Sequence, residues 1–331
     1  MRRFVSLLVA LVATISAGRV DAQQCTGGVA ARDACRKTID LVNFLAPEYA
    51  GALAGGNPMI GQGGTLGGLG HFTAALRSTR VIGALPQIGD QGFATGGEAR
   101  SSYSSASALV PALSVDVAFG LYRGFEVGAM HMGGVDALLS ATYMSELSHS
   151  SLDVALEGSN TNFGFGLRIG VVEETPTLPG IAFTYVKRDM PRFVVNGVTT
   201  QGSGAATAPG TITASSVLVT ATSLRLIAGK RFGMVDLTVG AGQDMYKSAA
   251  NVSAVVNASA PIGSQTATGT AAMDMTRLNI FADAAYNLNV FKFVGELGTS
   301  TGGSAPDALN TFGSAANSAR TYFTLSIRIG F

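Results

Sequence analysis

Histidine, the side chain best suited to acid–base chemistry near neutral pH, occurs only as His71, His131 and His149. Of these, His131 lies between apolar residues on an expected strand, as Met130-His131-Met132, where we expect a hydrogen-bonded structural role. The sequence contains no His-Glu-x-x-His helix and no Gly-x-x-x-x-Gly-Lys-Ser/Thr phosphate loop. We therefore expect no enzymatic activity and no cofactor.

Cys25 and Cys35 are the only cysteines and lie ten positions apart. In an exported protein, an even number of cysteines at short spacing favours a disulfide that closes a small loop. A pair of free thiols is the alternative. A metal site would need further ligands nearby, and the nearest histidine is His71. We expect a structural disulfide and no metal.

The remaining chemistry-bearing residues are charged side chains on the polar faces of segments in which apolar and polar residues alternate. Seven basic and six acidic residues occupy such positions: Arg77, Asp116, Asp136, Arg168, Arg188, Arg225, Asp236, Asp244, Arg277, Asp283, Lys292, Glu296 and Arg328. A set with balanced charge fits either an ion-pair network that fills an interior or the lining of a weakly selective channel.

The elements that position these charges are predicted to be strands, because alternation with a period of two gives a strand two different faces. Phe163, Phe165, Leu167 and Ile169, for example, alternate with Gly and polar residues. Each segment has about ten residues, the length that a tilted strand needs to cross a bilayer. A soluble sandwich would show the same alternation.

The composition narrows the class of protein. The chain has 331 residues, 43 of them Gly, with 13% charged residues and a net charge of +1, which excludes a disordered chain and a nucleic-acid-binding protein. No apolar stretch after the N-terminus is long enough for a helical membrane span. Since Trp is absent, tyrosines near the strand ends are expected to form the aromatic belt: Tyr122, Tyr143, Tyr185, Tyr246, Tyr286 and Tyr322.

Short turns alternate with long Gly/Ser/Thr/Ala-rich loops at 191–214, 250–271 and 303–319, which favours an outer-membrane barrel. We predict an all-β, transmembrane, antiparallel up-and-down β-barrel of ten to twelve strands, with ten favoured. The ten strands lie near 69–82, 111–122, 124–146, 161–174, 178–190, 216–231, 233–249, 272–287, 290–302 and 320–331. A turn at Gly133-Gly134, together with a further strand in 83–110, would give twelve.

The N-terminus is predicted to be an export signal. Residues 1–22 have a basic start, an apolar stretch from Phe4 to Ile15 and a small-residue site ending at Ala22. Residues 23–68 are expected to form a periplasmic or plug-like segment with a short helix, capped by Asp33 and ended by Ala46-Pro47. A linker is the alternative for this segment. The barrel then occupies 69–331.

The end of the chain, from Arg320 to Phe331, resembles the C-terminal assembly signal of Gram-negative outer-membrane β-barrel proteins. The residues that carry this resemblance are Tyr322, Phe323, Leu325, Ile327, Ile329 and Phe331. The resemblance implies recognition by the barrel assembly machinery and a place in the bacterial outer membrane, in contact with its lipid. The body of the chain is faintly similar to FadL-type transporters, whose Asn-Pro-Ala element corresponds here to Asn57-Pro58-Met59 and whose fourteen strands exceed the predicted number.

Two functions follow as hypotheses. The first is a porin-like passive or facilitated channel for small solutes, including hydrophobic ones, with the N-terminal segment as a hatch. The second is a structural or surface-interaction barrel whose lumen is plugged by the charged network. A continuous lumen after removal of residues 23–60 would favour the first, and a barrel without conductance would favour the second.

Overall fold

The computed structural model describes residues 25–87, 92–128, 130–149, 152–199 and 207–330. The predicted export signal and Phe331, the last residue of the assembly signal, lie outside these ranges. Among the described residues, no helix combines the length and apolar character needed to cross a membrane.

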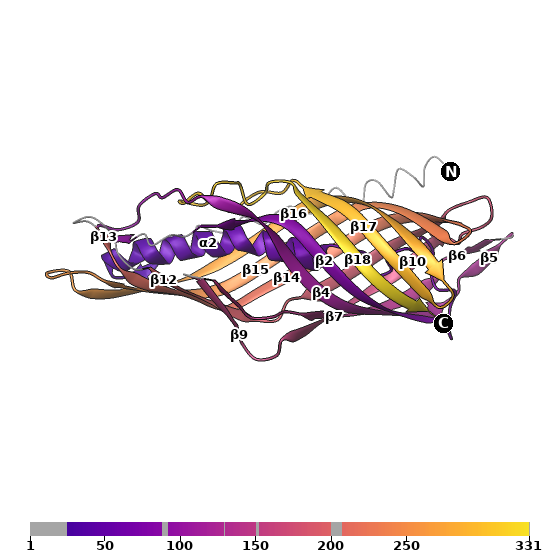
Figure 1. The fold of residues 1–331 in the computed structure, drawn as a ribbon, viewed down its shortest axis with the longest axis horizontal. Helices are drawn as coiled ribbons and strands as arrows, with labels where there is room; N and C mark the ends of the chain where they lie inside the picture. Colours follow the sequence, from indigo (N-terminus) through magenta and orange to yellow (C-terminus); the bar gives the residue numbers. More distant parts are fainter. Residues whose placement is uncertain (1–24, 88–91, 129, 150–151, 200–206, 331) are drawn as a thin grey trace.

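Ten antiparallel strands form a closed ring (Figure 1), which confirms the predicted ten-stranded up-and-down barrel. Each strand pairs with its neighbour in the ring, and the last strand pairs with the first through Thr324 and Thr79, so the ring has no free edge. The strands are β2 (Phe72–Pro86), β4 (Ser105–Tyr122), β7 (Val135–Tyr143), β10 (Thr161–Val172), β11 (Gly180–Asp189), β14 (Gly210–Phe232), β15 (Val235–Asn257), β16 (Ser264–Leu288), β17 (Phe291–Thr301) and β18 (Arg320–Gly330).

The two ends of the barrel differ in the length of their connections. One end carries the C-terminus and the short links 233–234 and 289–290, whereas the other carries the long connections 87–104, 190–209 and 302–319. Outer-membrane barrels have short turns towards the periplasm and longer loops outside. We therefore name the first end the inner end and the second the outer end.

The outer surface of the ring exposes large apolar side chains along its inner half. They include Leu76, Leu113, Val115, Phe119, Leu139, Phe163, Phe165, Leu167, Ile169, Leu226, Leu237, Val239, Leu278, Ile280, Phe293, Leu297, Leu325 and Ile327. A soluble protein rarely exposes so large a continuous apolar surface, and a barrel in lipid requires one. This belt and the closed ring are the architecture of an outer-membrane β-barrel.

Two of the predicted belt tyrosines are exceptions. Tyr122, Tyr143 and Tyr286 are exposed, but Tyr246 and Tyr322 are 0% and 1% exposed and point into the barrel. Tyr322 shares the strand parity of the inward-facing residues, and its hydroxyl donates to Asn279 at 3.1 Å. Their place in the aromatic belt was therefore predicted wrongly.

The predicted strand over 124–146 is also wrong as a single element. The structure divides it into a small hairpin at the inner end, β5 (Phe125–Val127) and β6 (Met130–Met132), followed by β7. Gly133 has a φ of 74°, in the left-handed region that glycine adopts without strain, so the chain turns there. The hairpin leaves the ring and projects beyond the C-terminus (Figure 1), so the ring still has ten strands.

Two of the three predicted outer loops, 191–214 and 250–271, are shorter than expected because parts of their sequences continue the strands, whereas the connection 302–319 is as long as predicted. The expected loop 250–271 is mostly β-hairpin, since β15 runs to Asn257 and β16 begins at Ser264. Short strands extend the same sheet at the outer end: β1 (Thr26–Gly27) on β16, and β12 (Phe193–Thr199), β9 (Leu152–Leu156) and β8 (Leu147–His149) beside β14. A separate pair joins β3 (Phe93–Ala94) and β13 (Thr207–Ala208).

Helix α2 (Val29–Ala54) lies inside the outer half of the barrel (Figure 1). Its predicted bounds were wrong, because it begins after Gly28, not Asp33, and passes through Pro47. A proline inside a helix removes one backbone hydrogen bond at a cost of about 3 kcal/mol. Almost every side chain of the helix is buried against the barrel, and that burial offsets the cost.

The N-terminal segment runs from the outer end towards the inner end. Gly28 N donates to Thr266 O at the outer end of β16, at 2.9 Å, and Leu66 N donates to Asp136 on β7 at 3.1 Å. Residues 55–66 therefore run through the lumen from the end of the helix towards the inner end, where the chain turns into β2. The described chain therefore enters the barrel from outside.

The direction of the N-terminal segment predicts that residues next to Cys25 are accessible from the outer side of the membrane. An epitope tag inserted between Gln24 and Cys25 is expected to bind antibody on intact cells, because Thr26 and Gly27 pair with the outer part of β16. The same tag between Gly233 and Met234, in the inner turn after β14, should become accessible only after permeabilisation. Accessibility in the opposite order would contradict the assigned orientation.

Candidate functional site

The thirteen charged residues expected to face the lumen all have buried side chains. Their exposed fractions lie between 0 and 9%. They are Arg77, Asp116, Asp136, Arg168, Arg188, Arg225, Asp236, Asp244, Arg277, Asp283, Lys292, Glu296 and Arg328. They alternate along their strands with the lipid-facing side chains, so they point into the lumen, where most of them contact the N-terminal segment. The candidate site is this contact between barrel and segment.

Three arginines converge on the C-terminal end of helix α2. Arg188 Nη1 donates to Leu53 O at 3.4 Å, Arg225 Nη2 donates to Ala54 O at 2.6 Å, and Arg77 Nη1 donates to Gly55 O. The last carbonyls of a helix have no partner within the helix, and the helix dipole places partial negative charge there. The arginines therefore satisfy these carbonyls and neutralise their charge inside the barrel.

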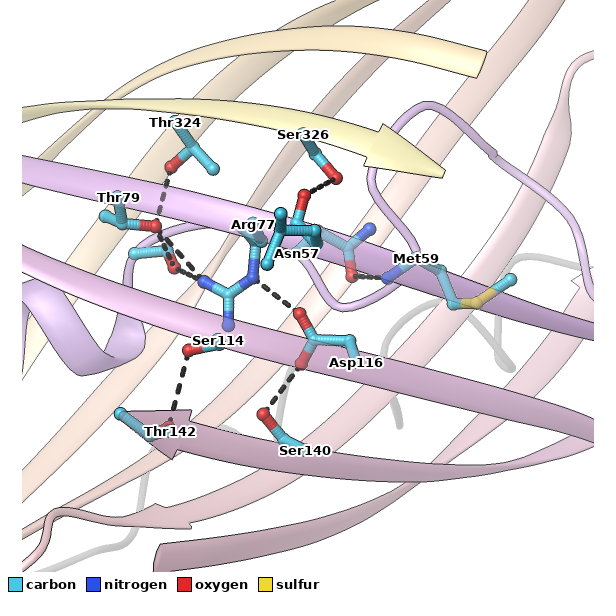
Figure 2. Close-up of polar contacts among 12 residues, drawn as sticks. Asn57, Met59, Arg77, Thr79, Ser114, Asp116, Ser140, Thr142, Thr324 and Ser326 are labelled. Carbon is cyan, nitrogen blue, oxygen red and sulfur yellow. Dashed lines mark hydrogen bonds and ion pairs between the residues drawn. The ribbon is translucent and has the colours of Figure 1, made fainter. Parts of the chain in front are cut away.

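Asp116 on β4 joins two of these arginines, and Figure 2 shows its contact with Arg77. Arg77 Nε lies 2.6 Å from Asp116 Oδ2, and Arg188 Nη2 lies 3.5 Å from Asp116 Oδ1. Ser140 on β7 donates its hydroxyl to the same carboxylate at 2.7 Å. Asp116 thus holds its two arginines in place beneath the helix end. Arg225 has its own carboxylate, Asp244, at 3.4 Å.

Threonines complete the contact at Gly55. Thr79 Oγ1 donates to Gly55 O at 3.2 Å and lies 3.0 Å from Thr324 Oγ1 on β18 (Figure 2). These side chains come from β2 and β18, the two strands that close the ring. The end of the helix is therefore fixed at the seam of the barrel.

Residues 57–66 are bound by their backbone atoms. Glu296 accepts from Asn57 N at 3.1 Å, and Asp136 accepts from Leu66 N with both oxygens at 3.1 Å. The remaining contacts are donated by basic side chains: Arg328 to Ile60 O at 3.3 Å, Lys292 to Gly61 O at 2.9 Å and Arg168 to Gln62 O at 2.5 Å. Acidic groups bind the N–H groups and basic groups bind the carbonyls, so the charged set satisfies the polar backbone of the segment.

Two apolar side chains of this segment fill the space between the charges. Met59 packs with Ala118, Leu138 and Val186, and Ile60 packs with Ala285 and Val294. Both are fully buried. Residues 55–66 and helix α2, from here on called the plug, therefore occupy the lumen with both polar and apolar contacts.

The outer half of the plug is held by carboxylates of the helix itself. Asp33 accepts from Ala94 N at 2.7 Å and Ala99 N at 2.9 Å, and Asp40 accepts from Leu309 N at 3.1 Å. Burial raises the pKa of the Asp40 carboxyl above its usual value, although Arg36 opposes this shift. These bonds tie the helix to the connections at the outer end.

A buried ion pair that the sequence analysis missed joins the helix to the ring. Arg320 Nη2 lies 2.6 Å from Glu48 Oε1, and Arg320 Nε donates to the same carboxylate at 2.7 and 3.0 Å. Arg320 shares the parity of Thr324 and Arg328 on β18, which is a signal that could have identified it. Glu48 had no such signal, because the helix was expected to end before it.

The predicted disulfide between Cys25 and Cys35 is present. It ties the start of the chain to the first turns of helix α2, beside Gly269 on β16. With the pairing of β1 on β16, the bond fastens the outer end of the plug to the barrel wall.

Gly63 lies close to the backbone of the barrel. A methyl group added at Gly63 would lie 2.3 Å from Gly229 N and 2.7 Å from Gly180 O, whereas one at Gly64 would be 3.9 Å from its nearest neighbour, Glu174 N. We expect Gly63→Ala to lower the free energy of unfolding by about 1–3 kcal/mol. Gly64→Ala is the matched control and should have little effect in urea unfolding, and equal effects of the two would contradict this packing.

A polar cavity of about 730 Å³ opens at the inner end, below the plug. Its walls include Gln62, Glu174, Lys230, Asp236 and Lys292. The charges are paired: Arg231 Nε lies 2.8 Å from Asp236, and Lys292 contacts the same carboxylate. The plug closes this cavity on the side that faces the interior of the barrel.

His131 lies on the hairpin at the inner end. Its Nδ1 is 2.8 Å from Glu173 and its Nε2 is 3.4 Å from Glu126. Within the described ranges, no three His, Cys, Asp or Glu side chains gather as metal ligands would. Gly298 to Gly302 match the Gly-x-Ser-x-Gly pattern, but they begin in the straight strand β17, whereas a nucleophile elbow is a strand-to-helix turn.

The other predicted charges also lie at the plug or its surroundings. Arg277 donates to Asn317 O at 3.3 Å and to Ser318 O in the outer connection before β18. Asp283 is in register with Glu296 on β17 and Thr238 on β15. The charged set therefore reaches from the inner cavity to the outer connections.

No protein-family model and no curated protein matches the sequence. Solved structures are similar at low identity. The translocator domain of the autotransporter NalP from Neisseria meningitidis is 11% identical, with 91% of this chain and 98% of that chain covered and a TM-score of 0.34. The outer membrane protease OmpT from Escherichia coli is 9% identical, with 79% and 97% covered and a TM-score of 0.38. The Pseudomonas putida toluene transporter TodX is 9% identical, with 78% and 88% covered and a TM-score of 0.28.

Proposed function

We propose that the protein is a closed outer-membrane barrel that acts through its outer surface and does not conduct solutes. The observation that carries this proposal is the plug: helix α2 is buried along its length, and eight of the thirteen lumen charges bind the backbone of residues 53–66. A channel lining needs charged groups that face water along the whole lumen, whereas here only the inner-end charges, such as Asp236 and Lys292, line a polar cavity and those above it face protein. The second of the two sequence-based hypotheses is therefore the better supported.

The structure favours a permanent plug over a mobile hatch for an energetic reason. Withdrawal of the plug would separate Arg77, Arg188 and Arg225 from the helix carbonyls and Glu296 from Asn57 N, leaving these groups to be rehydrated. Each buried hydrogen bond to a charged group contributes about 1.5–3 kcal/mol, and the disulfide and β1 hold the outer end as well.

Single-channel recording tests this proposal directly. The purified mature chain, refolded into a planar bilayer, is expected to show no conductance steps, with or without a reductant that opens the Cys25–Cys35 bond. The absence of conductance is informative only if the unheated protein migrates as a folded barrel on a gel. Steady steps from the folded, unmodified chain would overturn the proposal.

A gated channel is the second candidate, and one observation favours it. The polar cavity of about 730 Å³ at the inner end gives solutes from the periplasm access to the plug, at Gln62 to Thr65. Conductance that appears only when a solute is added to the inner side would support this function. The absence of such a response across a screen of small solutes would count against it.

A further inference from the structure

The outward faces of β14, β15 and β16 change in character from the inner end to the outer end. Near the inner end, they carry large apolar side chains, such as Leu226, Leu237, Val239, Leu278 and Ile280. This part faces the hydrocarbon core of the membrane, as established above for the belt.

Charged side chains come next along the same outward faces. Lys247 on β15 and Asp274 on β16 are in register, with Nζ and Oδ2 3.4 Å apart, and Lys187 and Asp189 on β11 are 3.6 Å apart. Arg80 on β2 is also exposed. Almost all other strand charges face the lumen, so this collar marks the height at which the outer surface meets a polar, charged layer.

Beyond the collar, the outward faces of β14, β15 and β16 are uncharged and rich in hydroxyl and amide groups. We name these residues the hydroxyl face: Thr211, Thr213, Ser215, Asn251, Ser253, Asn257, Ser264, Thr266, Thr268 and Thr270, with Ala249, Val255 and Ala272 between them. The inward residues of the same strands, such as Ala254, Val256 and Ala267, are buried in the cluster that includes helix α2.

The register aligns these groups in rows across the sheet. Ser253 on β15 lies between Thr213 on β14 and Thr268 on β16, and Thr26 on β1 continues the row beyond Thr268. At the other side of the row, Thr213 Oγ1 donates to Asn196 Oδ1 on β12 at 3.1 Å. The hydroxyl face is therefore a regular array of donors and acceptors on one sheet surface.

Contact with water alone does not explain why the hydroxyl face has many hydroxyl and amide groups and no charged side chain. Surfaces designed for solubility in water are given about 25–35% charged residues, and none of the residues of the hydroxyl face is charged. Hydroxyl and amide groups both donate and accept hydrogen bonds, so they complement a neutral partner that is itself rich in hydroxyl groups. Neutral sugars have this chemistry.

The height of the face indicates where such sugars lie. Leu278 in the belt and Thr268 are ten residues apart on β16. Ten strand residues span about 33 Å, which is about 25 Å along the membrane normal for a strand tilted by about 40°. The face therefore points sideways into the layer directly above the charged headgroups.

We propose that the hydroxyl face binds the neutral sugars of a glycolipid anchored in the surrounding outer leaflet. The three zones of the outer surface then match three layers of that leaflet: apolar chains, charged groups and sugars. The biological meaning of this inference rests on the proposed surface role. Its test measures sugar binding and the earlier one measures conductance, so either can fail alone.

The test compares two triple variants of the full mature chain in detergent. T211V/T266V/T268V removes three hydroxyls of the face and keeps the β-branched shape that suits a strand. T222V/T276V/T301V is the matched control, with three outward threonines closer to the membrane belt. Each protein is titrated with lipopolysaccharide that carries a core oligosaccharide and with lipid A that lacks it, and binding is followed by native mass spectrometry.

We expect the unmodified chain and the control variant to bind the sugar-bearing glycolipid about tenfold more tightly than lipid A, and T211V/T266V/T268V to lose most of that preference. Equal binding of the two glycolipids by the unmodified chain would overturn the proposal, as would equal losses in the two variants. Free core oligosaccharide binding as tightly as the glycolipid would also overturn it, because the membrane anchor would then play no part. Migration of each unheated variant as a folded barrel excludes misfolding.

Discussion

Deletion of residues 23–60 is expected to convert a silent barrel into one that conducts ions in steady steps. The deletion removes helix α2 and the first half of residues 55–66, and the ring strands from β2 to β18 stay intact. The side chains that bound residues 53–60 would then face water in the emptied part of the lumen: Arg77, Arg188, Arg225, Arg328 and Glu296. Conductance in a planar bilayer measures this directly.

The control for the deletion is a chain that keeps the plug but loses its covalent fastening. The double variant Cys25→Ser, Cys35→Ser removes the disulfide and leaves every lumen contact in place. It should stay silent. A deletion variant that migrates as a folded barrel and still conducts nothing would show that the charged side chains collapse to fill the lumen by themselves, and would contradict the role assigned to the plug.

Asp116→Asn is expected to lower the free energy of unfolding by about 3–5 kcal/mol, because the loss of one partner leaves an uncompensated buried charge. Asp116 is 2% exposed and is shared by Arg77 and Arg188, so its neutralisation leaves two buried guanidinium groups without their carboxylate. Urea titrations of the folded barrel, followed by the shift in migration between folded and unfolded protein, measure the loss.

Asp274→Asn is the matched control for this prediction. Asp274 also lies on a strand and pairs with a cation, but its partner Lys247 is largely exposed and the pair faces outward. Exposed ion pairs contribute about 0–1 kcal/mol, so little change is expected. Comparable losses for Asp116→Asn and Asp274→Asn would show that the lumen charges are hydrated and would contradict a dry, plugged interior.

The sequence predicted the ring well because strand parity is a strict rule. Residues such as Arg168 and Arg328 alternate with apolar neighbours, and a barrel has only an inside and an outside, so parity alone selects the side chains that the structure buries. The same rule applied to Arg320 would have added it to the set. The up-and-down strand order then followed from the short connections, whereas the register between neighbouring strands was not predicted.

The length of the helix, the extent of the outer hairpin and the backbone contacts of the plug could not be predicted from sequence patterns. Pro47 is a strong signal for the end of a helix, and only enclosure by the barrel overrides it. The Ser/Thr/Ala-rich stretch from 250 to 271 resembles a loop, but its small inward residues pack around the helix and extend the hairpin. Arg188 and Arg225 also donate to the carbonyls of residues 53 and 54, and contacts with backbone atoms cannot be predicted from residue types.

The path of the plug restricts the order in which the molecule can assemble. The N-terminal segment precedes β2, and the ring closes only when β18, the last strand synthesised, pairs with β2. A closed ring would have to let the disulfide-bearing part of the chain pass through its whole length, so we expect the segment to occupy its place before the seam forms. Thr79, which donates to Gly55 O, meets Thr324 across the seam, and this contact can form only when the ring closes. Closure of the barrel is thus also the step that traps the plug, and a bulky fusion placed before Cys25 should slow insertion into the membrane more than the same fusion in an outer connection.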